Sequence, residues 1–225
     1  MTEASGVIFD MDGVLVDSYQ AHFDSWRMMC DEWGLVMDEH DFARTFGRTS
    51  REVIRQLWGD RITEDRVIAT LDARKEALFR DLLRRDFPMM SGAVALIDRL
   101  HQAGFRLALG SSAPRENVQV VLDQIGRRDV FQVAITGDDV TRGKPDPQVF
   151  LLAAERLGVS AARCMVIEDA PLGIAAARAA GMRCVGLVSS GRTAEALCEA
   201  DLVIDRLEML DVPAVQRLLG LRVAG

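Results

Sequence analysis

Residues 7–17 have the sequence VIFDMDGVLVD. The run Val7 to Phe9 is apolar and rich in β-branched and aromatic residues, which is typical of a short buried strand. Asp10 and Asp12 follow where this strand ends, and Gly13 lets the backbone turn sharply away. Open α/β sheets bind ligands at the carboxyl ends of their strands, so the two carboxylates are candidates to meet one substrate. A strand followed by an acidic turn is the alternative, and this stretch alone does not decide between the two.

The composition excludes several classes of protein. A chain of 225 residues accommodates one large domain, or a core with an inserted subdomain. The net charge of −7 and the pI near 5.1 argue against a nucleic-acid-binding protein, which needs a clustered basic face. No segment approaches the roughly 18 apolar residues of a membrane span, and the N-terminus lacks a signal-peptide pattern, so we expect a cytoplasmic protein. The four cysteines show no metal-ligand spacing and are expected to be buried or incidental thiols.

Residues 18–88 have helical spacing throughout. Apolar residues recur at helical intervals over 18–33, 39–46, 50–58 and 63–83, with glycines between several of these segments. No alternating strand pattern occurs in this part of the chain. We therefore predict a small helical bundle inserted after the first strand, with the three tryptophans, Trp26, Trp33 and Trp58, in its core.

From Met89 onward, helix and strand patterns alternate. Strands are predicted at 105–109, 130–135, 163–168, 183–188 and 202–204, and helices at 91–102, 114–125, 147–157, 171–180 and 211–219. This alternation favours an α/β fold with a parallel sheet covered by helices. The predicted organisation is a core domain of residues 1–17 and 89–225 and a helical domain of residues 18–88.

Chemically active residues follow several of the predicted strands. Ser111 follows the second strand, Lys144 lies in the loop beyond the third, and Glu168 and Asp169 follow the fourth. Parallel strands align their carboxyl ends, so these residues are expected to converge on Asp10 and Asp12. Carboxylates from two strands form an oxygen-lined site that suits Mg²⁺, and the hydroxyl and the lysine supply donors for phosphate. A divalent cation and Lys144 would also offset the repulsion between these carboxylates and an anionic substrate.

The residue types predict roles in phosphoryl transfer. An ionised Asp10 can attack phosphorus, and Asp12 can give a proton to the leaving oxygen and later take one from water. Lys and Arg number 27, yet only Lys75 and Lys144 are lysines, which favours a specific role for Lys144 over a solvated loop charge. Ser111 and Ser112 are candidate phosphate ligands. Their alternative role, capping the next helix, is compatible with phosphate binding at that helix start.

These residues resemble the four motifs of the haloacid dehalogenase superfamily, in order along the chain. The motifs are Asp10-x-Asp12-Gly13-Val14-Leu15-x-Asp17-Ser18, Gly110-Ser111-Ser112, Gly143-Lys144-Pro145-x-Pro147 and Val166-Ile167-Glu168-Asp169-Ala170-x-x-Gly173. The chain is most similar to the subgroup with a helical cap, which includes sugar-phosphate phosphatases, phosphoglycolate-phosphatase-like enzymes and β-phosphoglucomutase. The resemblance implies a Rossmann-like core with 18–88 as the cap.

The resemblance also implies roles for individual residues. It assigns Asp10 as nucleophile, Asp12 as general acid/base, and Ser111 and Lys144 to phosphate binding. Mg²⁺ would be held by Asp10, the Asp12 carbonyl and Asp169, with Glu168 either a direct ligand or outside the first coordination sphere. Dehalogenation is not expected, because dehalogenating members lack the second aspartate and need no metal.

Substrate selectivity is expected to come from the cap, where His22, Gly47 and Arg48 are the candidates. The expected activity is Mg²⁺-dependent hydrolysis of a small phosphorylated, sugar-phosphate-like metabolite through an aspartyl-phosphate. The alternative is a β-phosphoglucomutase-type mutase, which the presence of Phe46 weakens, because the resembling mutases have a lysine there. A phosphonate-cleaving enzyme is less expected, because Lys75 lies on a charged helix, and so is a non-catalytic binding protein. We expect a monomer or weak dimer.

Overall fold

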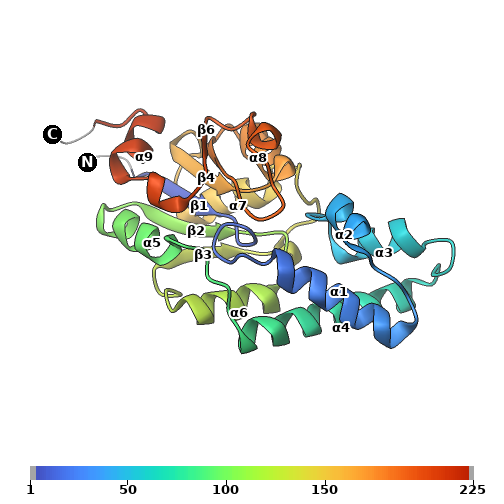
Figure 1. Cartoon of the computed structure of the whole chain (residues 1–225). Coiled ribbons are helices and arrows are strands. Elements are labelled where there is room, and N and C mark those ends of the chain that lie inside the picture. Colours follow the sequence, from blue (N-terminus) through green and yellow to red (C-terminus); the bar gives the residue numbers. More distant parts are fainter. Residues whose placement is uncertain (1–3, 223–225) are drawn as a thin grey trace. The chain divides into compact units, whose positions relative to one another are not determined.

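The computed structural model describes residues 4–222, and within them six parallel strands form one sheet in the order β3-β2-β1-β4-β5-β6 (Figure 1). The strands are β1 (Gly6–Phe9), β2 (Arg106–Gly110), β3 (Phe131–Ile135), β4 (Cys164–Glu168), β5 (Arg183–Leu187) and β6 (Leu202–Ile204). The predicted α/β class with a parallel sheet is confirmed.

Helices cover both faces of this sheet. They are α5 (Ala93–Gln102), α6 (Arg115–Ile125), α7 (Gln148–Leu157), α8 (Pro171–Ala179) and α9 (Val212–Leu218). Helix α7 packs on β1, β2 and β3, and α8 packs on β4 and β5. Together they bury one face of the sheet, which includes Ile8, Ala108 and Val166. Helix α5 packs on β2 and begins only after Gly92, whose left-handed backbone (φ 79°) delays the helix relative to the prediction. None of the helices within residues 4–222 is both long and apolar enough to cross a membrane.

The strand order reverses beside β1. The chain runs from β1 outward to β2 and β3, and then returns to the other side of β1 with β4, β5 and β6. Phe9 pairs with Ile167 in the sheet, and Asp10 N donates a hydrogen bond of 2.9 Å to Ile167 O. The carboxyl ends of β1 and β4 therefore lie side by side. Such a switch point is where open α/β sheets form their ligand crevices.

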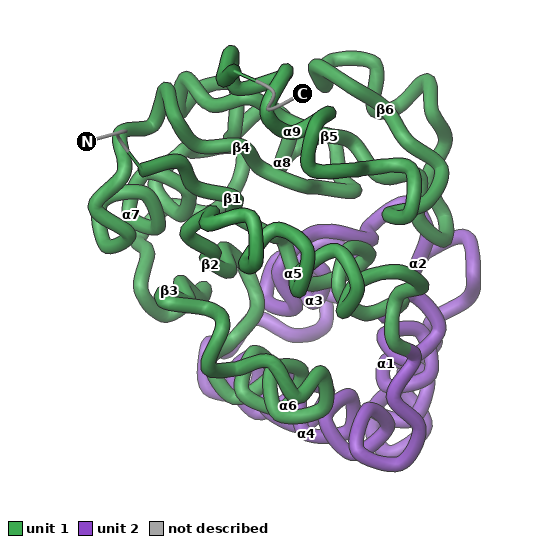
Figure 2. Tube along the Cα trace, turned by 90° about the vertical axis from the view of Figure 1, so that its left-hand side faces the viewer, with its two compact units in different colours: residues 1–17, 89–225 green, residues 18–88 purple. Residues whose placement is uncertain are grey.

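The chain divides into two compact units, residues 1–17 with 89–225 and residues 18–88 (Figure 2). The second unit consists of α1 (Tyr19–Trp33), α2 (Glu39–Thr45), α3 (Ser50–Trp58) and α4 (Asp65–Arg85), and we call it the helical unit. Helices α1 and α3 pack against α4 around a core that contains Trp26 and Trp58. The prediction for Trp33 is wrong: it is 45% exposed, because it is the last residue of α1 before Gly34 ends the helix.

A buried polar group, which we call the Lys75 cluster, lies inside the helical unit and consists of His22, Ser50, Lys75 and Glu76. Lys75 Nζ lies 2.9 Å from Glu76 Oε1 and 2.8 Å from His22 Nδ1, and Ser50 Oγ donates to Glu76 Oε1 at 2.6 Å. Lys75 is only 2% exposed. Although Lys75 lies on a helix rich in charged residues, the structure buries its ammonium beside an acid that compensates its charge.

Candidate active site at the carboxyl edge of the sheet

Lys144 lies between two carboxylates that belong to different strand ends. Its Nζ donates to Asp10 Oδ1 at 2.8 Å and to Glu168 Oε1 at 2.5 Å. The Lys144 side chain is 9% exposed, and its ammonium lies 4.9 Å from the centre of the Phe150 ring. Lys144 is therefore not a solvated loop charge. It joins the end of β1 to the end of β4 at the switch point of the sheet.

Three buried carboxylates form a group with the spacing of a metal site. Asp10, Glu168 and Asp169 each offer an oxygen, and these oxygens lie within 4.8 Å of one another. Asp169 Oδ2 also accepts a hydrogen bond of 2.7 Å from Ser189 Oγ. A donor set made of carboxylate oxygens suits a hard divalent cation such as Mg²⁺. We call these three residues the carboxylate group.

Glu168 differs from the other two members because the protein engages both of its oxygens. Oε1 accepts from Lys144 Nζ, and Oε2 accepts from Ala170 N at 2.8 Å. Its side chain is fully buried, with an exposed fraction of 0%. These contacts support a role for Glu168 in holding Lys144 and the loop after β4, which leaves Asp10 and Asp169 as the more available ligands.

The carboxylate group concentrates negative charge in a buried part of the protein. Burial, and then the charges of Glu168 and Asp169, raise the pKa of Asp10 well above its usual value, although Lys144 opposes this shift. Burial and the charge of Glu168 raise the pKa of Asp169 to about 7. For Lys144, burial alone would lower the pKa, but the charges of Asp10 and Glu168 outweigh it and raise the value. The excess of buried negative charge fits a site for a divalent cation.

A pH dependence of stability follows from the raised pKa of Asp169. Its pKa is about 7 in the folded, metal-free protein and near 3.8 when unfolded, so unfolding releases a proton between these pH values. Stability should therefore fall as pH rises from about 4 to 7, by at most about 1.4 kcal/mol per pH unit from this residue. Urea unfolding in EDTA at pH 5 and pH 7.5 measures the effect. Asp169→Asn should show a smaller loss, and an equal loss would contradict the assignment.

Two glycines allow the backbone to approach the carboxylate group. Gly13 has a φ of 74°, and a Cβ there would overlap the Asp169 carboxylate. Gly173, in the first turn of α8, would overlap the Glu168 carboxylate if it carried a Cβ. Both positions therefore need glycine for space, and Gly13 also needs it for its left-handed backbone.

Gly173→Ala is expected to lower kcat/KM by about 10²-fold or more. The new methyl group must displace Glu168, whose oxygens are held by Lys144 and Ala170, and a displacement of about 1 Å near a reacting centre has an effect of this size. Steady-state kinetics measure the change. Ala175→Gly exchanges the same two residue types at an exposed position of the same helix, away from Glu168, and should leave kcat/KM within about twofold. Equal kinetics for the two variants would contradict the role of Glu168.

Asp12 and the two serines lie at the same edge of the sheet. Asp12 is partly exposed in a tight turn in which Gly13 N donates to Val16 O at 2.8 Å. Ser111 follows β2 directly and is 2% exposed, and its Oγ accepts from Ala113 N at 3.0 Å. This contact closes the turn before α6 and does not cap the helix, whose N-cap is Pro114 without a side-chain hydrogen bond. Ser112 is partly exposed in the same turn, before α6 begins at Arg115.

The three candidate selectivity residues all belong to the helical unit. His22 is part of the Lys75 cluster and stacks on Phe79 with ring centres 3.9 Å apart. Gly47 has a φ of 95°, and Arg48 is exposed. Their assignment to substrate selectivity stays a prediction, as does the role of the helical unit as a cap.

Ser189 and Arg192 contact the carboxylate group, and the motif reasoning did not include them. Ser189 Oγ donates to Asp169, and Arg192 Nε lies 3.8 Å from the same oxygen, Oδ2. Both residues follow β5, so the rule that selected the other strand ends would also have selected this one. The signal was weak, because serine and arginine are common in surface loops and no acidic residue stands beside them.

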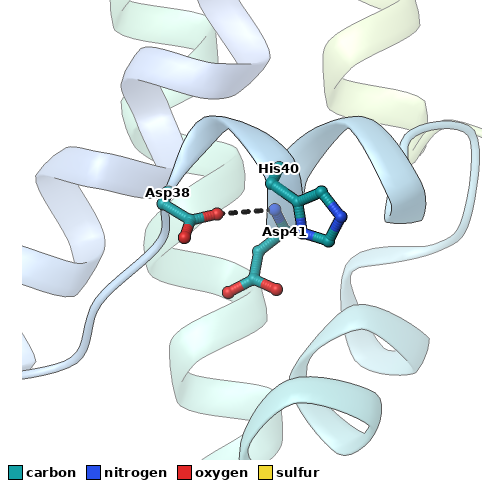
Figure 3. Close-up of side chains that lie close together, drawn as sticks. All are labelled: Asp38, His40 and Asp41. Carbon is teal, nitrogen blue, oxygen red and sulfur yellow. Dashed lines mark hydrogen bonds between the residues drawn. The ribbon is translucent and has the colours of Figure 1, made fainter.

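A second set of possible metal ligands lies in the helical unit at the start of α2 (Figure 3). It consists of Asp38, His40 and Asp41, and it is largely exposed. Asp38 caps the helix by accepting from Asp41 N at 2.7 Å, and Asp41 pairs with Arg44 at 2.7 Å. Helix capping and a surface ion pair account for this arrangement.

The site consists of buried carboxylates and a lysine at the switch point of an open parallel sheet, an arrangement that suits a metal ion and an anionic ligand. The model of the haloacid dehalogenase-like hydrolases matches residues 4–181, and the chain belongs to this family. The resemblance found in the four motifs is confirmed.

Known proteins of this family are similar over different lengths of the chain. Validoxylamine A 7'-phosphate phosphatase of Streptomyces hygroscopicus subsp. limoneus is 40% identical over 126 residues, which cover 56% of this chain and 59% of that protein. A phosphorylated carbohydrates phosphatase of Thermotoga maritima is 31% identical over 201 residues, with 88% and 91% covered. The crystal structure of CbbY from Rhodobacter sphaeroides in complex with phosphate superposes with a TM-score of 0.87 at 25% identity, covering 95% of this chain and 99% of that one. The chain spans about half the length of most of the curated relatives that it matches.

Proposed function

We propose that the protein is a Mg²⁺-dependent phosphatase that hydrolyses a small phosphorylated metabolite, of the sugar-phosphate type, through a phosphorylated Asp10. The observation that carries the proposal is the position of Lys144, whose ammonium bridges Asp10 and Glu168 beside the carboxylate group. A nucleophile, a fixed cation and an oxygen-rich metal site then occupy one sheet edge. Relatives that are named as phosphatases of phosphorylated compounds support the same substrate class.

In the first step, Asp10 attacks the phosphorus of the substrate. A bond forms between an Asp10 carboxylate oxygen and phosphorus, and the bond from phosphorus to the leaving oxygen breaks. Asp12 supplies the proton that the leaving oxygen needs, so the product departs as a neutral alcohol. Lys144 holds Asp10 in position and offers its positive charge to the phosphate oxygens.

In the second step, water hydrolyses the acyl-phosphate on Asp10. Asp12, now ionised, takes a proton from the attacking water. The water oxygen bonds to phosphorus as the bond between phosphorus and the Asp10 oxygen breaks. Inorganic phosphate leaves, and both aspartates return to their starting states. The partial exposure of Asp12, against the burial of Asp10, supports this division between a proton carrier and a nucleophile.

The Asp10 carboxylate, the Asp12 carbonyl and Asp169 would hold the Mg²⁺, with Glu168 supporting them. When bound, the cation neutralises the crowded carboxylates and the phosphate and so keeps Asp10 ionised for attack. Burial and the neighbouring carboxylates raise the pKa of Asp10, so a metal-free protein is expected to be a poor catalyst.

The distinction from a mutase rests on Phe46. Its ring packs 4.9 Å from the centre of Tyr19 and 5.3 Å from that of Phe42. The position where the similar mutases have a lysine is therefore part of an aromatic cluster. This supports transfer of the phosphoryl group to water. A Schiff-base reaction at Lys75 is also disfavoured, because its ammonium is buried against Glu76.

The test is a phosphate-release assay with the purified full-length chain. We expect an aryl phosphate to be hydrolysed in the presence of Mg²⁺ and at least about 10²-fold more slowly with EDTA, with recovery when Mg²⁺ is restored. A screen of sugar phosphates, phosphoglycolate, nucleotides and phosphonates then identifies the substrate class.

Two outcomes would overturn the proposal. Hydrolysis that is unaffected by EDTA would contradict the role of the metal. Conversion of β-glucose 1-phosphate to glucose 6-phosphate, without release of phosphate, would show that the enzyme is a mutase.

A further inference from the structure

The turn after β5 directs two side chains at one oxygen of the carboxylate group. Arg192 N donates to Ser189 O at 3.1 Å, and Gly191 between them has a φ of 77°, so the chain folds back over residues 189–192. From this turn, Ser189 Oγ reaches Asp169 Oδ2 at 2.7 Å, and Arg192 Nε lies 3.8 Å from the same atom. We call this segment the 189–192 turn.

Contacts from two sides restrict the Asp169 side chain. Its carboxylate is 5% exposed, and it lies so close to Gly13 that no side chain fits there. The Ser189 hydroxyl also lies next to Gly13, at 3.0 Å from the position of a Cβ. Asp169 is therefore enclosed by the turn after β1 on one side and by the 189–192 turn on the other. The hydrogen bond to one oxygen of Asp169, combined with this enclosure, fixes the rotation of the Asp169 carboxylate.

Orientation matters at this position because neighbours that hydrogen-bond to metal ligands set the affinity of a metal site. Loss of one such partner typically weakens metal binding by about 10- to 100-fold. The other members of the carboxylate group have their own partner, since Lys144 holds both Asp10 and Glu168. For Asp169, the short hydrogen bond comes from Ser189.

We propose that Ser189 is a positioning residue for the metal site, and that its hydroxyl holds Asp169 in the orientation in which it groups with Asp10 and Glu168. The inference rests on the proposed Mg²⁺ dependence and adds to it a part of the site after β5. Ser189 acts through Asp169, and the 189–192 turn fixes where its hydroxyl lies.

The test measures Mg²⁺ binding without substrate, by isothermal titration calorimetry of the full chain with MgCl₂. Ser189→Ala is expected to raise the Kd about tenfold, whereas Ser189→Thr, which keeps the hydroxyl, should stay within about threefold of wild type. Ser190→Ala is the matched control. Ser190 lies in the same turn but donates to Asp17 at 2.9 Å, outside the carboxylate group, so its loss should leave the Kd unchanged.

The outcomes separate the role of Ser189 from the proposed metal dependence. Wild-type affinity in Ser189→Ala would overturn the inference, as would a folded Ser189→Thr that binds as weakly as the alanine variant. An equal loss in Ser190→Ala would show that any disturbance of the turn weakens the site and would also overturn it. Absence of Mg²⁺ binding by the wild-type protein would instead contradict the metal-dependent function and, with it, this inference. Circular dichroism in EDTA establishes that each variant is folded.

Discussion

Asp10→Asn is expected to lower kcat by at least ~10⁴-fold, because an amide cannot form the acyl-phosphate on which both steps of the proposed reaction depend. The amide has nearly the same size as the carboxylate, and it removes a buried charge that lies near Glu168 and Asp169. Those neighbours and burial already raise the Asp10 pKa, so a neutral group is tolerated at this position. We therefore expect the melting temperature to change by only a few degrees.

The measurement combines phosphate release with a thermal melt of the same preparation. Asp98→Asn is the matched control, since it makes the same chemical change in a carboxylate outside the site. Asp98 lies on α5, and its Oδ1 is 2.8 Å from Arg127 Nε. It should retain wild-type kcat within about twofold. Substantial Mg²⁺-dependent turnover by Asp10→Asn would show that another group attacks phosphorus, and the assignment of the nucleophile would have to be abandoned.

Glu76→Ala is expected to destabilise the helical unit by about 3–5 kcal/mol. The substitution leaves the Lys75 ammonium buried without its carboxylate, and removal of one partner from a buried ion pair has a cost of this size. It also removes the acceptor of the 2.6 Å hydrogen bond from Ser50. The effect arises from desolvation of a charge and is much larger than that of breaking a surface ion pair.

Tryptophan fluorescence during urea unfolding measures this change in the right place, because all three tryptophans of the chain lie within residues 18–88. The double variant Lys75→Met/Glu76→Leu is the informative control. It replaces both charges with apolar side chains and should recover most of the lost stability. If the double variant were as unstable as Glu76→Ala, the cause would be lost packing or another contact of Glu76, and the charge argument would fail.

The pattern of the chain was sufficient to predict most elements of the fold. The apolar run after Gly6 predicted β1, and the alternation after Met89 predicted β2 to β6, each to within one residue, because strand periodicity and turn-forming residues are local properties. The helical unit follows the same rule: in the structure, the left-handed Gly34 ends α1, and a capping box of Thr49 and Glu52 begins α3. Trp33 departed from expectation, because exposure at a helix end depends on what packs there.

The positions of the candidate site residues were predicted through one long-range rule, the alignment of carboxyl ends in a parallel sheet. That rule brought Asp10, Asp12, Ser111, Glu168 and Asp169 to one edge before any contact was known. The rule also applies to the end of β5, but Ser189 was not selected there, because the residue types at that strand end had no distinctive chemistry by themselves.

Local periodicity therefore determined which helices and strands form. Residue identity determined which candidate acid, base and anion-binding groups follow the strand ends. Only the tertiary structure decided which groups touch. Lys144 is separated from Asp10 by 134 residues, and their 2.8 Å contact depends on the strand order around β1. The same holds for the two lysines, because packing buried each of them against an acid. The physical reason is that charge burial and carboxylate spacing are set by contacts between distant segments, which a local pattern does not contain.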